Sequence, residues 1–221
     1  MPIIPPKQNQ RILAPFRYFG SKSRRLGFVL PFLPEKPGAR VYPFGGGRQL
    51  PVQSRNEVTA WDAAAIRNTP ILNQNDLNGD AVNLFKIVAN PQKLSQLLEL
   101  IFATPYSRAE FHRAFAASDD PLEQARRFLI RQQQSFGGLG RSFGVQVDRQ
   151  GRNSSNMTRW ADLGDALKIV HQRVRHWIFE CQDFQKILEF YDRPSTAFYC
   201  DPPYIPATRS GGRHRAAAIS F

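Results

Sequence analysis

The sequence predicts an α/β fold, and three observations lead to this prediction. Short apolar segments alternate along the chain with longer segments in which apolar residues recur at helical spacing. A glycine run, Gly45-Gly46-Gly47, directly follows the short apolar segment 41–44. An acidic residue, Asp201, directly follows another such segment, 196–200. Because strands that alternate with helices form a parallel sheet, we expect a ligand site where the strands end.

The individual elements follow from apolar spacing and from helix-breaking residues. This spacing predicts two helices between 80 and 100, separated at Asn90-Pro91, and further helices at 107–117, 121–134, 163–174 and 184–191. Ser107 and Glu110 have the spacing of a capping box. Strands are predicted at 41–44, 177–181 and 196–200, and the last strand is expected to be buried. Residues 135–160 are rich in Gly, Arg, Ser and Asn, and predict a long irregular loop or a short hairpin.

The composition favours a nucleic acid as partner. Thirty Lys and Arg residues against 18 Asp and Glu residues give a net charge of +12, which attracts polyanions. The sequence has no apolar run of about 18 residues and no pattern of a signal peptide, so we expect neither a membrane span nor secretion. The two cysteines have neither metal-ligand spacing nor a disulfide framework. We therefore expect a cytoplasmic protein without a metal.

The tetrapeptide Asp201-Pro202-Pro203-Tyr204 carries the chemistry. The exocyclic amine of adenine is a poor nucleophile because its lone pair is delocalised into the ring. A carboxylate that accepts one amine hydrogen, with a backbone carbonyl that accepts the other, localises this lone pair. Consecutive prolines fix the backbone, and the neighbouring aromatic offers a face on which a flipped base can stack. The alternative is a Pro-Pro turn that closes a strand, with Asp201 as a local cap.

Four motifs occur in a fixed order, and together they are far more specific than any one of them. They are Phe16–Lys22, Pro43–Gly47, Asn75–Asp80 and Asp201–Tyr204. In this order they resemble the Dam-type DNA adenine methyltransferases, which include many phage and restriction-associated members. Two further stretches, Gln134–Gly138 and Asn153–Asn156, also resemble phage-type members. The resemblance covers about residues 15–48 and 75–213.

The resemblance implies a Rossmann-like methyltransferase sheet with a mostly helical target-recognition insert. The expected domains are an N-terminal part of the core at 1–101, the insert at 102–172, and a return to the core at 173–221. The implied enzyme is a monomer that transfers a methyl group from S-adenosyl-L-methionine to a flipped adenine in double-stranded DNA. Cytosine N4 methylation and RNA methylation use related motifs, but these groups more often carry Ser and Asn, respectively, at the position of Asp201.

The resemblance also implies the cofactor-binding residues. They are Tyr18, Lys22, Phe44, Gly45, Gly46, Gly47, Asp76, Asp183 and Phe184. Asp76 is assigned to the ribose hydroxyls, and Asp183 and Phe184 to the neighbourhood of the cofactor adenine. Two alternatives stay open for the ribose ligand. Asp76 precedes a helix and has the position of an N-cap, and Asp62 ends a rival strand-like stretch, 54–62.

The resemblance assigns the catalytic roles to Asp201, the carbonyl of Pro202 and Tyr204. For DNA we predict contacts from five residues of the insert: Arg131, Arg141, Asn153, Asn156 and Arg159. The alternative is a solvated basic surface.

Two departures from the family pattern affect the expected activity. Tyr42 stands where the family usually has an acid, and 48–53 does not fit the small-residue helix start expected after the glycines. The chain also ends 17 residues after Tyr204. From these departures we expect a truncated gene product, and a frame shift would account for both odd segments. The alternative function is accordingly a catalytically inactive remnant that binds DNA.

Overall fold

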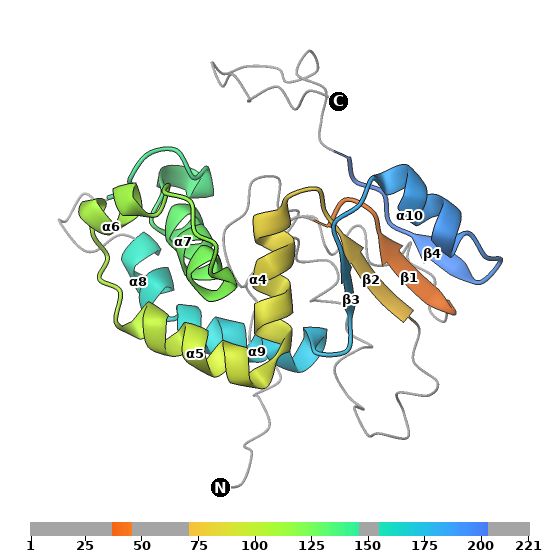
Figure 1. The fold of residues 1–221 in the computed structure, drawn as a ribbon, viewed down its shortest axis with the longest axis horizontal. Coiled ribbons are helices and arrows are strands. Elements are labelled where there is room, and N and C mark those ends of the chain that lie inside the picture. The colour runs from red at the N-terminus through yellow and green to blue at the C-terminus, as the bar shows by residue number, and fades with distance from the viewer. Residues whose placement is uncertain (1–36, 46–70, 146–154, 203–221) are drawn as a thin grey trace, which may run out of the picture.

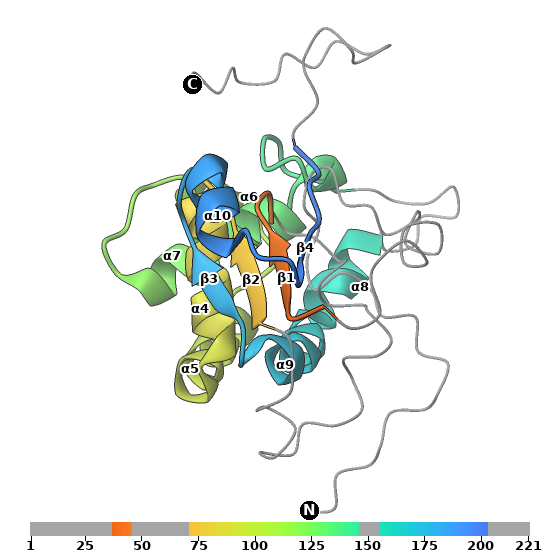
Figure 2. The ribbon, with the colours of Figure 1, turned by 90° about the vertical axis from the view of Figure 1, so that its right-hand side faces the viewer.

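A computed structural model describes residues 37–45, 71–145 and 155–202 of the chain (Figure 1). Its centre is a parallel sheet of four strands in the order β3-β2-β1-β4 (Figure 2). The strands are β1 (Ala39–Tyr42), β2 (Ile71–Asn75), β3 (Ile178–Glu180) and β4 (Thr196–Phe198). This is the order of the first four strands of a Rossmann sheet. Strands β2 and β3 are added on one side of β1, and β4 is added on its other side. The predicted α/β class is confirmed.

Both faces of the sheet are covered, as a parallel sheet requires. On one face, Ala39 and Val41 of β1 pack against Ile187 and Tyr191 of helix α10 (Phe184–Tyr191). The other face contacts helix α4 (Gly79–Ala89), where the ring of Phe85 stacks 5.7 Å from the ring of Phe179. The sheet therefore lies between α10 on one side and the helical part of the molecule on the other (Figures 1 and 2).

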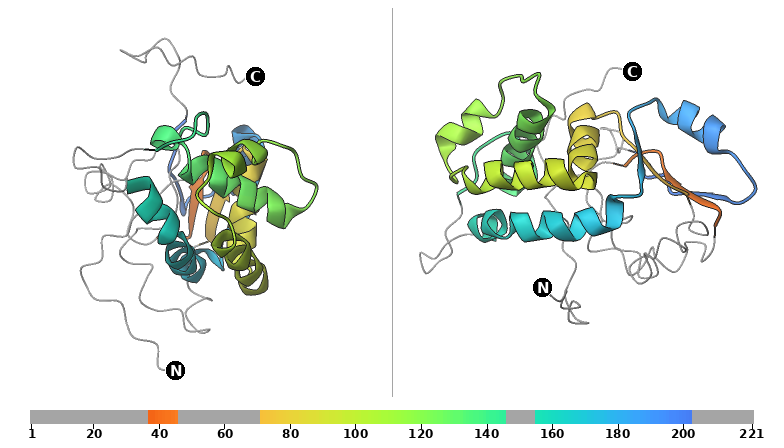
Figure 3. Two further views of the ribbon diagram at one scale, coloured as in Figure 1. Left: turned by 90° about the vertical axis from the view of Figure 1, so that its left-hand side faces the viewer. Right: turned by 60° about the horizontal axis from the view of Figure 1, so that its bottom comes forward.

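The helices form one layer built around α4. They are α5 (Pro91–Phe102), α6 (Arg108–Arg113), α7 (Pro121–Gln133), the short 3-10 helix η4 (Phe136–Gly138), α8 (Ser155–Ala161) and α9 (Leu163–Val174). Helices α5 and α9 run alongside each other, with α4 and α7 across them (Figure 3, right). Apolar side chains of α4, α5, α7 and α9 form a single core with Leu72 of the sheet and Trp177. The predicted boundary at 101/102 therefore separates helices that share this core, and the division into domains stays a prediction.

Local capping explains most of the helix ends. The side chain of Asn90 accepts a hydrogen bond from the Lys93 N–H at 3.0 Å, and Pro91 begins α5. The predicted break between two helices is thus confirmed, since Asn90 ends one helix and caps the next. Ser107 caps α6, but the predicted capping box with Glu110 is wrong. Ser107 accepts from Ala109 N at 3.2 Å, but its own N–H donates to Gln134 Oε1, and Glu110 pairs with arginines.

Two elements were not predicted. Strand β2 contains three polar residues in a row, and α8 lies where an irregular segment was expected. Strand β4 is half-buried rather than buried, because it is the outermost strand of the described sheet. The strand-like stretch 54–62 lies outside the described residues. Within the described ranges, no helix is both long enough and apolar enough to span a membrane.

Candidate active site

The four parallel strands end at one edge of the sheet, and the segments that follow them carry most of the predicted site residues. After β1, the backbone turns tightly over the end of β2. The N–H of Gly45 donates to the carbonyl of Asn75. A Cβ atom at Gly45 would lie 2.5 Å from Cγ of Gln74 and 2.8 Å from the Asn75 oxygen. Only glycine fits this turn, so the first of the three predicted glycines is required by the packing.

Asp76 follows β2 directly and is half-buried. Its N–H donates to the Glu180 carbonyl at 3.2 Å, and its Oδ1 accepts from the Asn78 N–H at 2.7 Å. The N-cap of α4 is Asn78, whose Oδ1 accepts from the N–H groups of Asp80 and Ala81 at 3.1 and 3.4 Å. The alternative role of Asp76 as the helix cap is therefore wrong, and its carboxylate lies at the strand end. The rival acid, Asp62, lies outside the described residues.

The segment after β3 meets the segment after β1. The ring of Phe184 lies 5.1 Å from the ring of Phe44, with the two planes inclined by 34°. Asp183 caps α10, since its Oδ1 accepts from the Gln185 N–H at 2.8 Å. Leu77 was not singled out from the sequence, yet its side chain is 62% exposed beside Asp76. Leu77 stands out only by this exposure at a strand end, which the structure shows and the sequence does not.

Asp201 follows β4. Because β4 pairs with β1, the segment that carries Asp201 is adjacent in the sheet to the segment that carries the glycine turn. The Tyr199 N–H donates to the Val41 carbonyl at 2.9 Å, which extends the pairing beyond the strand itself. Asp201 is half-buried and Pro202 is exposed. Pro203 and Tyr204 lie outside the described residues, as do Tyr18, Lys22, Gly46 and Gly47.

Tyr42, which replaces the usual acid, belongs to the core. It is buried, its ring stacks at 8° on Trp177 with 6.4 Å between centroids, and it also meets the ring of Tyr199. An aromatic ring packed in the core therefore stands at the position where the resemblance leads us to expect an acid.

Two of the predicted DNA contacts are used inside the protein. Arg131 pairs with Asp80 of α4 and donates to the Ala114 carbonyl at 2.9 Å. Asn156 is buried, and its Nδ2 donates to the Ser135 carbonyl at 3.5 Å. Arg141 and Arg159 are exposed, and Asn153 lies outside the described residues.

Arg141 belongs to a turn, residues 134–144, that follows α7. The turn is closed by hydrogen bonds from Phe136 N to the Ser142 carbonyl and from Gly144 N to the Gln134 carbonyl, each 2.8 Å. Three glycines adopt positive φ values, which fold the tip back on itself. The hydroxyl of Tyr106 donates to the Gly144 carbonyl and anchors the turn. The turn therefore holds two exposed side chains, Phe136 and Arg141, on a fixed backbone, at the same upper side of the molecule as the end of β4 (Figures 1 and 2).

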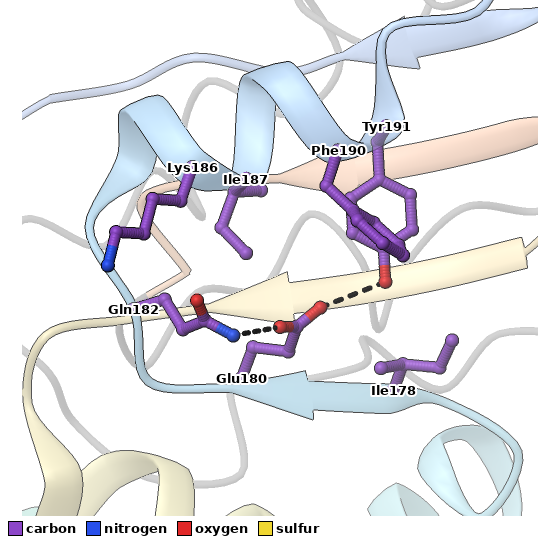
Figure 4. A pocket seen from close by; sticks show the side chains of 7 residues that line it. All are labelled: Ile178, Glu180, Gln182, Lys186, Ile187, Phe190 and Tyr191. Carbon is purple, nitrogen blue, oxygen red and sulfur yellow. Dashed lines mark hydrogen bonds between the residues drawn. The ribbon is translucent and has the colours of Figure 1, made fainter.

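A hollow of about 510 Å³ lies between α10 and the outer strand β3 (Figure 4). Glu180 lies in its wall and accepts from the Tyr191 hydroxyl at 2.9 Å, from Asn73 Nδ2 at 2.8 Å and from Gln182 Nε2 at 2.9 Å. Burial, and then the hydrogen bond with Glu180, raise the pKa of Tyr191 to about 12. These hydrogen bonds join the side chains of Asn73, Glu180, Gln182 and Tyr191 in the wall of the hollow.

The sheet order, the glycine turn after β1 and the acids after β2 and β4 define an α/β protein of the Rossmann-like, nucleotide-cofactor-binding class. The family model of the D12 class N6 adenine-specific DNA methyltransferases matches residues 18–214, and the chain belongs to this family. It is also similar to the DNA adenine methylase of Haemophilus influenzae, with 28% identity over 215 residues, which are 92% of this chain and 67% of that protein. The predicted enzyme class, an adenine-specific DNA methyltransferase, is confirmed. Enzymes of this family generally use S-adenosylmethionine.

Proposed function

We propose that this protein transfers a methyl group from S-adenosylmethionine to N6 of a flipped adenine in double-stranded DNA, as a monomer. The observation that carries the proposal is the position of Asp201 just after the end of β4, the strand beside β1 and its glycine turn, in a chain of the N6-adenine-specific family. A cofactor and a base bound at these two strand ends would be neighbours.

The residues at the strand ends fit the cofactor. The tight turn at Gly45 leaves backbone rather than side chain at the end of β1, where a ligand can approach closely. The carboxylate of Asp76 suits the ribose hydroxyls. The exposed side chain of Leu77 and the ring of Phe184 offer apolar surface to a purine. We retain Phe44, Gly46, Gly47, Tyr18, Lys22 and Asp183 as further cofactor residues. When bound, S-adenosylmethionine supplies an electrophilic methyl group.

The protein's part in catalysis is to orient and polarise the amine. The Asp201 carboxylate accepts one hydrogen of the adenine amine, and the carbonyl of Pro202 accepts the other. The nitrogen lone pair then points out of the hydrogen-bonding plane toward the methyl donor. Tyr204 provides the face on which the extruded base stacks. Fixed orientation of the two reactants supplies much of the acceleration.

DNA contacts are proposed for the exposed part of the insert. Arg141 and Phe136 lie on the rigid turn 134–144, and Arg159 is exposed on α8. An arginine on a fixed turn can reach a phosphate or a guanine edge, and an exposed aromatic can stack on a base. We keep Asn153 as a candidate for the same surface. Arg131 and Asn156 contribute by holding the insert together, because their contacts are internal.

A second function is favoured by one observation, the buried ring of Tyr42 in place of the usual acid. If this change abolishes productive cofactor binding, the protein is a DNA-binding member of the family without turnover.

Transfer of a labelled methyl group to unmethylated duplex DNA separates the two functions. We expect the wild-type protein to label DNA and Asp201→Asn to lower the rate by about 100-fold or more, while the Kd for S-adenosylmethionine changes little. The matched control is Asp119→Asn, which changes an exposed carboxylate between α6 and α7 and should leave the rate unchanged. A wild-type protein that binds DNA but never labels it would establish the second function instead.

A further inference from the structure

Asn75 is the last residue of β2, and its amide side chain is buried, with 1% of the residue exposed. It lies between the end of β1 and the end of β3, the two strands that flank β2. A buried amide is tolerated only where its donors and acceptors find partners. The partners of Asn75 are all backbone atoms of the two neighbouring segments.

The side chain makes three hydrogen bonds. Its Nδ2 donates to the Pro43 carbonyl at 3.0 Å and to the Gln182 carbonyl at 2.8 Å. Its Oδ1 accepts from the Gln182 N–H at 2.8 Å. The backbone carbonyl of Asn75 in addition accepts from the Gly45 N–H. One residue thus fixes the segment after β1 and the segment after β3 relative to β2.

These two segments are the ones that carry Phe44 and Phe184, whose rings lie 5.1 Å apart. Each ring is within two residues of a backbone group that Asn75 holds. We propose that Asn75 is a positioning residue, which sets the spacing between the glycine turn and the start of α10 and thereby the affinity for the cofactor. This inference rests on the proposed function, because it takes both segments as walls of the cofactor site.

Asn73 provides a matched control on the same strand. It lies two residues earlier, so its side chain is on the same face of the sheet. It is equally buried, with 0% exposed, and its Nδ2 donates to Glu180 Oε1 at 2.8 Å and to the Tyr191 hydroxyl at 3.0 Å. These partners are the side chains of Glu180, the last residue of β3, and of Tyr191 on α10, so Asn73 makes no hydrogen bond to the backbone of either segment.

The experiment compares Asn75→Ala with Asn73→Ala in the full chain. Binding of S-adenosylmethionine is measured by calorimetry, stability by urea unfolding, and KM and kcat by methyl transfer. We expect both variants to lose stability, because each removes buried hydrogen bonds. Only Asn75→Ala should raise the Kd and the KM for S-adenosylmethionine, by about tenfold. A change of this size corresponds to the net free energy of about one hydrogen bond that organises the site before the cofactor binds. Its kcat at saturating cofactor should change less.

A second variant keeps the test decisive if Asn75→Ala does not fold. Asn75→Asp has the same shape but places carboxylate oxygens against the carbonyls of Pro43 and Gln182. It should bind the cofactor weakly at neutral pH. Burial against two carbonyl oxygens raises the pKa of the new carboxyl, so binding should recover in part as the pH is lowered and protonation restores one donor. Equal weakening by both alanine variants, or wild-type affinity in folded Asn75 variants, would overturn the inference.

Hydrogen exchange separates this inference from the proposed function. Without any ligand, Asn75→Ala should speed exchange of the Gly45 and Gln182 amides, and Asn73→Ala should not. A wild-type protein that does not bind S-adenosylmethionine would end the proposed function, and with it the link to cofactor affinity. The exchange rates would still decide whether Asn75 holds the two segments.

Discussion

Glu123 on α7 shows how single charged residues stabilise the helical layer. Its carboxylate accepts from Arg126 Nε at 2.6 Å and from Arg127 Nε at 2.7 Å. The hydrogen bond from Arg126, followed by that from Arg127, lowers the pKa of Glu123 from 4.5 to about 2. Arg126 also bonds Thr104 and Glu110, so the carboxylate belongs to a network that joins α6 and α7.

This lowered pKa predicts how stability depends on acid. Because the pKa is lower in the folded protein, the contribution of Glu123 is complete above pH 4.5 and is lost as the pH falls toward about 2. Glu123→Gln should cost about 1 kcal/mol at pH 7 and progressively less below pH 4.5. Urea unfolding of both proteins at several pH values measures this difference, and a constant difference down to pH 2 would contradict the assignment.

At the scale of elements, the turn 134–144 is the part of the insert that most depends on glycine. A Cβ atom at Gly144 would lie 2.6 Å from the N atom of Phe136 and 2.8 Å from the carbonyl carbon of Ser135. Both atoms are backbone, so the closing pair of the turn would have to open.

We therefore expect Gly144→Ala to weaken binding to duplex DNA by about tenfold or more, because Phe136 and Arg141 lose their fixed position. The affinity for S-adenosylmethionine should stay within about twofold, since the cofactor segments are elsewhere. Gly79→Ala is the matched control, because a Cβ atom there meets nothing within 4 Å. Fluorescence anisotropy with labelled duplex reads out the difference, and equal DNA affinity of the two variants would show that the turn does not contact DNA.

For the whole molecule, the net charge of +12 predicts DNA binding that weakens steeply with salt. Replacing a cation that contacts a phosphate should reduce the slope of log K against log salt by about 1. We expect this for Arg141→Ala and Arg159→Ala. Lys168→Ala should keep the wild-type slope, because Lys168 pairs with Asp165 on α9, at the lower side of the molecule in Figure 1. A slope that falls equally in all three variants would indicate a diffuse basic surface.

The sequence predicted those features that depend on nearby residues. Helices α4, α5, α7, α9 and α10 have apolar stripes, and all of these except α9 begin with a side-chain cap. Their observed bounds lie close to the predicted ones. Strand β2 was missed because Asn73 and Asn75 are polar, and their partners, Glu180 and Gln182, lie far away in the sequence. Asparagine in a strand can only be recognised as buried when these distant partners are known.

The predicted site residues also divide into those with a local sequence signal and those whose contacts depend on distant residues. Asp201 was singled out because it follows a predicted strand, and Asp76 because the stretch Asn75–Asp80 resembles a family motif and precedes a helix. The internal role of Arg131 depends on Asp80 and on the end of α6, neither of which lies near it in the sequence. Charge and composition describe an arginine's preference for anions, but the fold decides which anion it meets.

The pairing of β1 with β4 has a consequence for how the enzyme matures. Ala39 pairs with Thr196, so this contact closes a loop that contains nearly all of the described chain. Contacts between such distant segments form slowly, and a chain that leaves the ribosome from its N-terminus can complete them only at the end. The turn around Gly45, the helices and the turn 134–144 can therefore assemble before β4, the strand that precedes Asp201, has left the ribosome. A nascent chain would then have these parts before it has the proposed catalytic acid, Asp201, and methyl transfer could begin only after β4 has paired with β1.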